Sequence, residues 1–388
     1  MKAVVLAAGE GKRLGPLTER RPKPMIPVGN KPILESVLTT AIDAGVDSAV
    51  FVVGHARERI QSHFGDGDEW DIPIEYVVQK HRLGGAHALS QVESAVDGPF
   101  LTLHGDQLVE RRLLDRLIER WTETNDPVMA AVQSTRPTEY GAVEIDGDAV
   151  RSVSPTPTAD PPFLVNGGAY VFDERVFEAA RNVTETADGD FGMATALQRL
   201  ANKQALSAVR HQGPWQDLTY PWDLLSTNAT LLHDHEDGDE RSREGVHETA
   251  VIADDVALDE GVSVGPNATL LSGTSVGRNV RIGANATLSN CIVMDGGRIG
   301  NGAVLNDCIL GESASVGPNV TVEGGSARVV VDDAIHRDVT LGGVVADGAR
   351  LGGNVTLTPG TVVGQDVSAH SGTVLEGQIE SGETVRRA

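Results

Sequence analysis

The chain has 388 residues, 40% of them apolar, which is enough for two or three domains with separate cores. Asp and Glu outnumber Lys and Arg by 55 to 32, and the formal net charge is −23. So acidic a surface repels nucleic acids and anionic membranes, which excludes both as general partners. No apolar run reaches the about 20 residues that a membrane-spanning helix needs, and no signal-peptide pattern precedes KAVVLAAG, so we expect a cytoplasmic protein.

Lysine is rare in this chain, and the lysines are Lys2, Lys12, Lys23, Lys31, Lys80 and Lys203. An acidic surface that keeps arginine and has little lysine is typical of a protein working in concentrated salt, where charge repulsion is screened within a few ångströms. We therefore expect a halophilic host.

Residues 1 to about 230 alternate short apolar runs with helical periodicity. Buried strands are expected at KAVVLAAG (2–9), SAVFVVG (48–54), IEYVVQ (74–79) and PFLTLHGD (99–106). Between the first two, KPILESVLTTAIDAGV (31–46) has the apolar spacing of a helix face. This order predicts an α/β fold with a Rossmann-like, mostly parallel sheet covered on both sides. Ligands of such sheets bind beyond the carboxyl ends of the strands.

A glycine-rich and basic segment, LAAGEGKRLGPLTERRPKPM (6–25), follows the first expected strand. Its glycines match neither the dinucleotide fingerprint nor the Walker loop. Gly9 and Gly11 nevertheless allow the backbone to approach a phosphate chain closely, and Arg13 and Lys23 supply positive charge. The other nearby cations are expected to be solvated surface residues: Arg20, Arg21 and Lys31.

Further segments follow in order: QKHRLGGAHAL (79–89), LHGDQ (103–107), YGAVE (140–144), VNGGAYVFD (165–173) and WQDLTYPWDLL (215–225). Together with LAAGEGKRLGPLT and RPKPM, they resemble the signatures of the sugar-1-phosphate nucleotidyltransferases. The resemblance covers nearly the whole chain and is strongest to archaeal members that carry a left-handed β-helix after the transferase domain. It implies an enzyme that forms a nucleotide sugar and pyrophosphate from a nucleoside triphosphate and a sugar 1-phosphate.

The resemblance also implies a role for each matched position. Arg13 and Lys23 would be catalytic and would bind the phosphates. The nucleotide would be contacted by Leu6, Ala8, Gly9, Gly11, Gln79, Gly84 and Gly85. The sugar phosphate would be contacted by Gly141, Asn166 and Gly167. The cofactor Mg²⁺ would be held by Asp106 and Asp217. Asp223 is a rival for the metal, and Asp217 is preferred because it follows the tryptophan as in the family pattern.

The sequence narrows the choice of nucleotide but does not assign the sugar. An amide such as that of Gln79 offers a donor and an acceptor that fit a pyrimidine edge, which favours UTP or dTTP without deciding between them. Family members commonly carry a Glu-Lys pair that touches the sugar, before the element with Asn166. Ser154 and Pro155 occupy that neighbourhood here and Asp160 is the only acid, so the sugar is not assigned.

A charged segment, HDHEDGDERSREG (233–245), separates this region from one of different composition. We expect a nucleotidyltransferase domain at 1–230, an acidic linker at 231–246 and a further domain at 247–388. There, apolar residues recur every six residues, at Val264, Leu270, Val276, Ile282, Leu288 and Met294, after one slip at Ile299 and Leu305, and again at Val345, Leu351, Leu357, Val363, Ala369 and Leu375. This hexad period predicts a parallel β-helix, left-handed by the resemblance.

Three hexads form one coil, so residues about eighteen apart lie above one another. Cys291 and Cys308 span the one-residue slip and are therefore expected at the same point of successive coils. Their spacing suggests neither a disulfide framework nor a zinc site, and we expect two stacked small side chains without a redox role.

Two alternative functions are considered, and the first is acetyl transfer by the β-helix. Bifunctional relatives use it to acetylate glucosamine 1-phosphate, with a His, a Tyr and a Lys, but no Tyr or Lys follows residue 220 here. His336 and His370 are expected at the surface. We therefore expect a scaffold that assembles a homo-oligomer, a trimer or a multiple of one, and little or no acetyl transfer. A silent regulatory relative is the other alternative, disfavoured by the retained motif residues.

Overall fold

The computed structural model describes residues 1–81, 83–134, 136, 140–154, 164–181, 192–234 and 244–387. Chain contacts divide it into two compact units. The first comprises Met1–Glu10, Arg21–Met25 and Ile33–Asp217. The second comprises Gly11–Arg20, Ile26–Pro32 and Leu218–Ala388. This division differs from the sequence boundary at residue 230, because the segment after Asp217 clusters with the repeat region.

The first unit is built on a nine-stranded sheet. Its spatial order is β5 (Ile74–Val78), β4 (Ser48–Val53), β1 (Lys2–Ala7), β6 (Phe100–His104), β11 (Leu164–Phe172), β8 (Val128–Gln133), β12 (Ser207–His211), β10 (Ala149–Ser154) and β9 (Ala142–Asp146). The four strands expected from sequence are present and mutually parallel. The expectation of a mostly parallel sheet is corrected, because β11 runs antiparallel to both β6 and β8 and the sheet is mixed.

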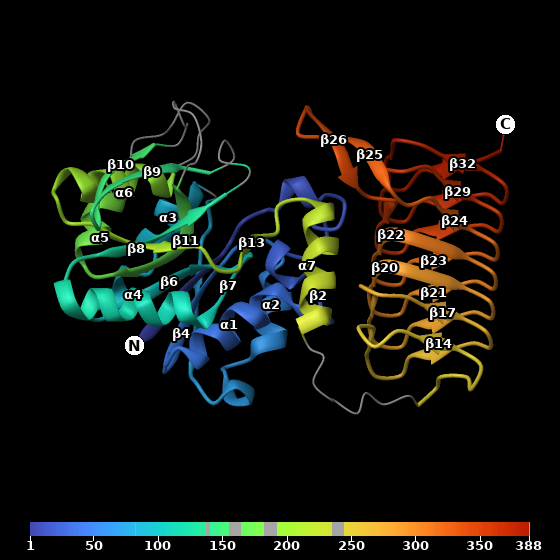
Figure 1. The fold of residues 1–388 in the computed structure, drawn as a ribbon, viewed down its shortest axis with the longest axis horizontal. Helices are drawn as coiled ribbons and strands as arrows, with labels where there is room; N and C mark the ends of the chain where they lie inside the picture. Colours follow the sequence, from blue (N-terminus) through green and yellow to red (C-terminus); the bar gives the residue numbers. More distant parts are fainter. Residues whose placement is uncertain are drawn as a thin grey trace. The chain divides into compact units, whose positions relative to one another are not determined.

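Helices cover both faces of this sheet (Figure 1). They are α1 (Ile33–Asp43), α2 (Arg57–Phe64), α3 (Gly84–Ser90), α4 (Arg111–Thr124), α5 (Arg175–Arg181) and α6 (Met193–Asn202). The helices α3, α5 and α6 bury their apolar residues in one core with alternate residues of the strands, such as Val4, Phe100 and Met129. The helices α1 and α4 contact each other and pack on the sheet through buried leucines, among them Leu34 and Leu113. The helix expected at 31–46 is thus confirmed as α1.

Short elements complete the part of the first unit that positions the site. Two strands pair outside the main sheet, β7 (Gln107–Val109) and β13 (Trp215–Asp217). Single turns of 3-10 helix are η2 (Lys23–Met25), η3 (Asp68–Trp70) and η4 (Glu93–Ala95). In the second unit lie η1 (Lys12–Leu14) and the paired strands β2 (Pro27–Val28) and β3 (Lys31–Pro32).

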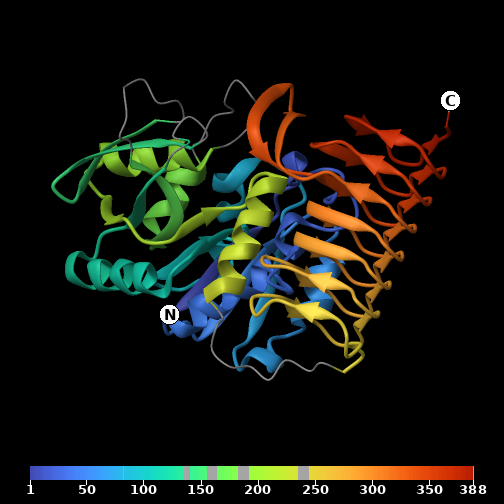
Figure 2. The same cartoon turned by 45° about the vertical axis from the view of Figure 1, so that its right-hand side comes forward.

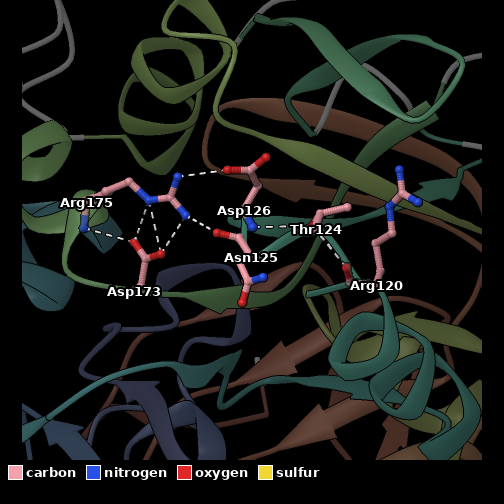
Figure 3. Close-up of polar contacts among 6 residues, drawn as sticks. All are labelled: Arg120, Thr124, Asn125, Asp126, Asp173 and Arg175. Atoms are coloured by element: carbon pink, nitrogen blue, oxygen red, sulfur yellow. Dashed lines mark hydrogen bonds and ion pairs between the residues drawn. The ribbon is translucent and has the colours of Figure 1, made fainter. Parts of the chain in front are cut away.

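Arg175 links two turns of the first unit at the start of α5 (Figure 3). Its guanidinium pairs with Asp173 at 2.7 Å and with Asp126 at 2.8 Å, and it donates to the carbonyl of Asn125. The hydrogen bonds and charges of the two carboxylates raise the pKa of Arg175, against the effect of burial. Because Asn125 and Asp126 follow α4 while Asp173 follows β11, one side chain fastens both turns.

Replacing Arg175 with methionine is expected to lower the free energy of unfolding by about 1–2 kcal/mol, since charge-assisted but partly exposed hydrogen bonds are lost. Urea unfolding followed by circular dichroism measures this change. The matched variant Arg151→Met removes a more exposed Arg–Asp pair, with Asp146. It is expected to change stability by less than about 0.5 kcal/mol. Equal losses in the two variants would contradict a fastening role for Arg175.

The second unit contains a parallel β-helix whose coils stack from β14 to β32 in Figure 1. One sheet holds β14 (Val251–Ile252), β15 (Ala257–Leu258), β17 (Thr269–Leu270), β18 (Ser275–Val276), β20 (Thr287–Val293), β22 (Val304–Leu310), β24 (Thr321–Val322), β27 (Gly343–Val345), β29 (Thr356–Leu357), β30 (Thr361–Val363), β32 (Val374–Leu375) and β33 (Gln378–Ile379). The other holds β16 (Ser263–Val264), β19 (Arg281–Ile282), β21 (Arg298–Ile299), β23 (Ser315–Val316), β28 (Arg350–Leu351), β31 (Ser368–Ala369) and β34 (Thr384–Val385).

The register of these strands confirms the hexad prediction. Val264 pairs with Ile282 in the next coil, and the predicted inward residues are buried in one continuous core. Cys291 pairs with Cys308 across the shorter coil, as expected, with their sulfur atoms 3.6 Å apart. Both are free, buried thiols. The hydrogen bond with Cys291, and then burial, raise the pKa of the Cys308 thiol well above its usual value, so it stays protonated at neutral pH.

A β-hairpin interrupts the repeat between the coils of β24 and β27. It consists of β25 (Ser326–Val331) and β26 (Ala334–Thr340) and stands out from the stacked coils in Figure 2. The insertion explains why the hexad period disappears from the sequence before Val345. His336 lies on this hairpin, half-buried against the rings of Tyr220 and Trp222, so it is not the solvated coil residue expected. His370 is exposed, as expected.

Helix α7 (Pro221–Asp234) is attached to the β-helix through one buried amide. The side chain of Asn228 is fully buried, accepts from the N–H of Gly29 at 2.8 Å and donates to the carbonyl of Gly273 at 2.8 Å. The linker expected at 231–246 therefore begins inside this helix, and residues 235–243 lie outside the described residues. No helix of the described chain is both long and apolar enough to cross a membrane.

Candidate active site

The carboxyl ends of β1 and β6 meet at one edge of the sheet. The N–H of Gly105 donates to the carbonyl of Leu6 at 3.0 Å, which places Asp106 beside the segment that follows β1. Gln79 leaves the end of β5, where its N–H donates to Val53. The structure thus brings Leu6, Ala8, Gly9, Gln79 and Asp106 to the same edge, where ligands of such sheets bind.

Lys23 lies between two carboxylates at this edge. Its ammonium is 2.6 Å from Asp106 Oδ2 and 3.7 Å from Asp217 Oδ1. The side chains of Lys23 and Asp217 are only 10% and 9% exposed, and that of Asp106 is 29% exposed. Three residues from η2, the end of β6 and β13, remote in sequence, therefore form one charged cluster. Burial makes each charge depend on the others, because an unpaired buried ion is costly.

Asp106 of this cluster and the neighbouring His104 have shifted pKa values. Burial alone would raise the pKa of Asp106, but the Lys23 ammonium and His104 outweigh it and hold the pKa below its usual range. Burial lowers the pKa of His104 despite the nearby carboxylates of Asp106 and Asp217. At neutral pH the cluster accordingly contains ionised Asp106 and neutral His104.

Sequence reasoning missed two residues that flank the Gly-Asp pair of LHGDQ. His104 Nε2 is buried with no hydrogen-bond partner among the described residues, and so is Gln107 Oε1. Gln107 stands opposite Asp217 in the β7–β13 pair, and a Cβ at Gly168 would lie 1.6 Å from its Oε1. Gly168, at φ +68°, is therefore the residue that makes room for Gln107. The only sequence signal for either was a position within two residues of Asp106.

Asp106 and Asp217 are the candidate ligands for a divalent metal. No group of three or more His, Cys, Asp or Glu side chains that could hold a metal occurs in the described ranges. Asp106 and Asp217 therefore offer two carboxylates, and phosphate oxygens or water must complete the coordination. This is the mixed oxygen set that Mg²⁺ takes in phosphoryl-transfer enzymes, so the residues present fit a hard divalent ion.

Asp223, the rival metal ligand, has a different position. Its Oδ2 accepts from the backbone N–H groups of Thr219 at 3.1 Å and Tyr220 at 2.9 Å, at the start of α7. This is a helix-terminus contact that stabilises the turn before α7. The geometry therefore supports the preference for Asp217.

The residues expected at the sugar phosphate lie together. The N–H of Asn166 donates to Gly141 at 2.9 Å, and Asn166 Oδ1 accepts from the hydroxyl of Tyr170 at 2.8 Å. Trp215 Nε1 donates to the carbonyl of Gly167 at 3.0 Å, which links this group to β13 and Asp217. Residues 155–163, which include Pro155 and Asp160, lie outside the described residues.

Gly167 has a packing reason for being glycine as well. A Cβ there would lie 2.9 Å from Val132 Cγ1 and 3.0 Å from Ala130 Cβ on β8. Close packing of β11 on β8 alone thus excludes a larger residue. Its glycine identity is no evidence for ligand contact.

The segment expected at the nucleobase is organised by Gln79. This residue is 5% exposed, and its amide nitrogen donates to the carbonyl of Gly84 at 3.2 Å and lies 2.9 Å from His87 Nδ1. Gly84, at φ +81°, and Gly85 begin α3. The side chain of Gln79 therefore orders the turn in which Gly84 and Gly85 lie.

Gly11 and Arg13 belong to the second compact unit, in the segment Gly11–Arg20. Gly11 precedes η1 at φ +66°, a conformation that favours glycine. Arg13 lies over the ring of Tyr220, 5.9 Å from its centroid, and is 3.5 Å from Asp332 at the tip of the hairpin. Half of its side chain is exposed.

One expectation for the other cations of this segment is corrected. Arg21 is buried, at 4% exposure, and is not a solvated residue. Arg20 is exposed, as expected, and forms an exposed ion pair with Asp366 of the β-helix. Lys31 is exposed, as expected. The basic segment is thus divided between the two units, with Lys23 in the first and Arg13 and Arg20 in the second.

A mixed α/β sheet with a glycine-rich segment, a lysine and two carboxylates at its carboxyl edge, followed by a β-helix, defines a class of nucleotide-dependent transferases. Comparison with known proteins agrees. The family model described as "Nucleotidyl transferase" matches residues 2–234, more than half of the chain, and that described as "GMPPB C-terminal domain" matches residues 252–380.

Similar proteins include the "Bifunctional protein GlmU" of Methanococcus vannielii, which is 28% identical over 98% of this chain and 96% of the relative. Agl11 of Haloferax volcanii, a "low-salt glycan biosynthesis nucleotidyltransferase", is 31% identical over 69% of this chain and 74% of its own length. AglF of the same organism, a "UTP--glucose-1-phosphate uridylyltransferase", is 34% identical over 58% and 93%. A solved UDP-glucose pyrophosphorylase shares the fold, with a TM-score of 0.55 and 19% identity over 60% of this chain and 99% of that one.

The chain belongs to the nucleotidyl transferase family. The resemblance to the sugar-1-phosphate nucleotidyltransferases is thereby confirmed, and with it the expectation that the chain is an enzyme. Enzymes of this family generally use a divalent metal ion. The halophilic character expected from composition fits the two Haloferax relatives.

Proposed function

We propose that the enzyme joins UTP or dTTP to a sugar 1-phosphate, forming a UDP- or dTDP-sugar and pyrophosphate. A phosphate oxygen of the sugar 1-phosphate attacks the α-phosphorus, and pyrophosphate leaves from the opposite side. The observation that carries the proposal is the Lys23–Asp106–Asp217 cluster at the carboxyl edge of the sheet. No protein nucleophile is needed, so the chain's task is to position and neutralise two anions.

The residues divide this task by their chemistry. Lys23 is assigned to the α-phosphate, where its ammonium stabilises charge that develops during attack. Arg13 and the backbone N–H groups around Gly9 and Gly11 are assigned to the triphosphate. Gly141, Asn166 and Gly167 are assigned to the sugar phosphate, a role favoured by their mutual contacts.

We assign a magnesium ion to the carboxylates of Asp106 and Asp217. When bound, it supplies charge neutralisation and orientation of phosphate oxygens. Lys23 lies between these carboxylates and balances their charge, so the cluster is neutralised in part by the chain itself.

A pyrimidine base is favoured by the position of Gln79. Its amide nitrogen is engaged within the chain, so we assign the amide oxygen to the base. An acceptor matches the N3–H of uracil and of thymine, which cytosine lacks. The relative AglF is named as a UTP--glucose-1-phosphate uridylyltransferase, which makes UTP and glucose 1-phosphate the first pair to test.

Pyrophosphate release tests the proposal. The protein is incubated in high salt with Mg²⁺, each nucleoside triphosphate and a panel of sugar 1-phosphates, including those of glucose and N-acetylglucosamine. Release with UTP or dTTP and at least one sugar is expected, and EDTA is expected to stop it. No release with any pair would contradict the function. Acetyl-CoA consumption with glucosamine 1-phosphate is not expected, because no Tyr or Lys follows residue 220.

We further propose a homo-oligomer built on trimers through the β-helix. One outer face carries a column of β-branched residues in register on successive coils: Val251, Thr269, Thr287, Val304, Thr321, Thr356 and Val374. Val251 and Val374 are 59% and 68% exposed. The column carries no charge and mixes apolar valines with threonines. Such a continuous, uncharged surface suits contact with a second copy of the chain.

Val304→Arg, in the middle of this column, is expected to yield monomers by light scattering in high salt, because burying an unpaired guanidinium at a subunit contact is costly. Ser263→Arg, an exposed position on the other sheet, is the matched control and is expected to leave the mass of the assembly unchanged. An unchanged mass for Val304→Arg would place the interface elsewhere.

A further inference from the structure

The segment Gly11–Arg20, proposed above to bind the triphosphate, rests on a corner of the β-helix. Gln365 lies between β30 and β31 and is 3% exposed. Its amide nitrogen donates to the carbonyl of Pro16 at 3.1 Å. Leu14, Pro16, Leu17 and Thr18 of the same segment are buried. A buried hydrogen bond thus joins the centre of the segment to the β-helix.

Two residues near Gln365, one next to it and one on the following coil, also contact the segment Gly11–Arg20. Asp366 forms an ion pair with Arg20, and Ser381 Oγ donates to the carboxylate of Glu19 at 3.2 Å. The hydrogen bond and charge of Asp366 raise the pKa of Arg20, with smaller contributions from Asp347 and Glu19. These contacts come from neighbouring turns of stacked coils, since the N–H of Asp366 donates to Asp347 and that of Gly382 donates to Gln365.

Gln365 uses a side-chain N–H donor at a corner where the side chains of other coils accept hydrogen bonds from the preceding coil. At the same corner, Asp295 and Asp347 accept from backbone N–H groups of the preceding coil, those of Arg278 and Glu312. Ser381 does the same for the N–H of Gln365. An acceptor therefore suffices for coil stacking. The Gln365 amide carries an N–H donor, which a carboxylate lacks, and that donor is used on Pro16.

We propose that Gln365 is a positioning residue for nucleotide binding. Through Pro16 it holds the segment Gly11–Arg20 in the conformation in which Arg13 and the backbone N–H groups near Gly11 receive the triphosphate. An ordered segment pays less conformational entropy when the nucleotide binds, so the contact lowers the KM for the nucleotide. The inference rests on the proposed function and adds to it a role of the β-helix in substrate binding, apart from assembly.

Gln365→Met keeps the size of the side chain and removes the donor. Because one hydrogen bond contributes about 0.5–1.5 kcal/mol, the KM for the nucleotide is expected to rise about 2- to 10-fold. The kcat and the KM for the sugar phosphate are expected to stay within about twofold, because neither depends on triphosphate ordering. Gln378→Met, an exposed glutamine on the same β-helix, is the matched control and should change none of these values.

A second variant covers the case in which Gln365→Met does not fold. Asp366→Asn alters an exposed ion pair and leaves the buried amide in place. It is expected to raise the nucleotide KM about twofold at the lowest salt in which the protein stays folded, and not at high salt, because exposed ion pairs are screened.

The outcomes separate this inference from the proposed function. A folded Gln365→Met with an unchanged nucleotide KM, or with parallel losses in kcat and both KM values, overturns the inference. Calorimetric titration with UTP adds a readout independent of turnover. A wild-type chain that binds UTP without releasing pyrophosphate contradicts only the function, and weaker UTP binding by Gln365→Met still supports the positioning role. A chain that binds no nucleotide overturns both.

Discussion

Replacing Lys23 with methionine is expected to lower kcat/KM by about 10²–10³-fold, the range seen when one preorganised charge donor is removed from a reaction centre. The ammonium lies 2.6 Å from Asp106 and 3.7 Å from Asp217, and nothing else in the cluster carries a fixed positive charge among the described residues. Steady-state pyrophosphate release measures the loss, which should fall mainly on kcat if Lys23 acts on the transition state.

Lys203→Met is the matched control for this variant. Lys203 also pairs with a carboxylate, Glu178 at 3.1 Å, but its side chain is 57% exposed on the surface. It should keep full activity. Lys23→Arg retains the charge with a different shape and is expected to recover only part of the rate, because an arginine fork does not replace a point charge. Full activity of Lys23→Met would remove Lys23 from the reaction centre.

Asp217 and Asp223 lie close together in the sequence, but replacing each with asparagine is expected to give opposite effects on activity. Asp217→Asn should lower kcat/KM by about 10²-fold or more and raise the Mg²⁺ concentration needed for half-maximal rate, because a charged metal ligand is lost. Asp223→Asn should keep near-normal activity, since an amide oxygen can still accept from Thr219 and Tyr220 at the start of α7. Its expected stability loss is below about 1 kcal/mol.

Rates over a series of Mg²⁺ concentrations, with unfolding curves of both variants, check this pair of expectations. Asp217 lies in β13, two residues after Trp215, whereas Asp223 lies in α7. A reversed outcome, with Asp223→Asn inactive and Asp217→Asn active, would move the metal site to the start of α7. Equal and modest losses would mean that neither carboxylate binds the ion.

The elements that sequence patterns predicted well are those whose signal is local. Strands β1, β4, β5 and β6 were predicted because each is an apolar run bounded by turn residues, and α1 because its apolar residues recur at helical spacing. The β-helix was predicted from a period of six that recurs between Val264 and Leu375. The antiparallel direction of β11 was not predicted, because direction within a sheet depends on crossovers that no short pattern encodes.

The candidate site shows the same division. The motifs placed Lys23, Asp106 and Asp217 on a list of phosphate and metal residues, but their mutual distances required the fold. His104 and Gln107 were missed because nothing in their types or spacing set them apart from ordinary core residues. Arg21 was misplaced as a solvated residue because a charged side chain gives no sequence signal of its own burial.

By itself, the sequence determined the class of enzyme, the repeat architecture and the chemistry of the segment from Leu6 to Met25, since these follow from contiguous motifs and a fixed period. Only the tertiary structure decided that this basic segment is divided, with Lys23 between two carboxylates and Pro16 held by Gln365 of the β-helix. Pro16 and Gln365 are 349 residues apart in the chain. A contact over such a separation is decided by how coils and loops pack, which local residue patterns do not contain.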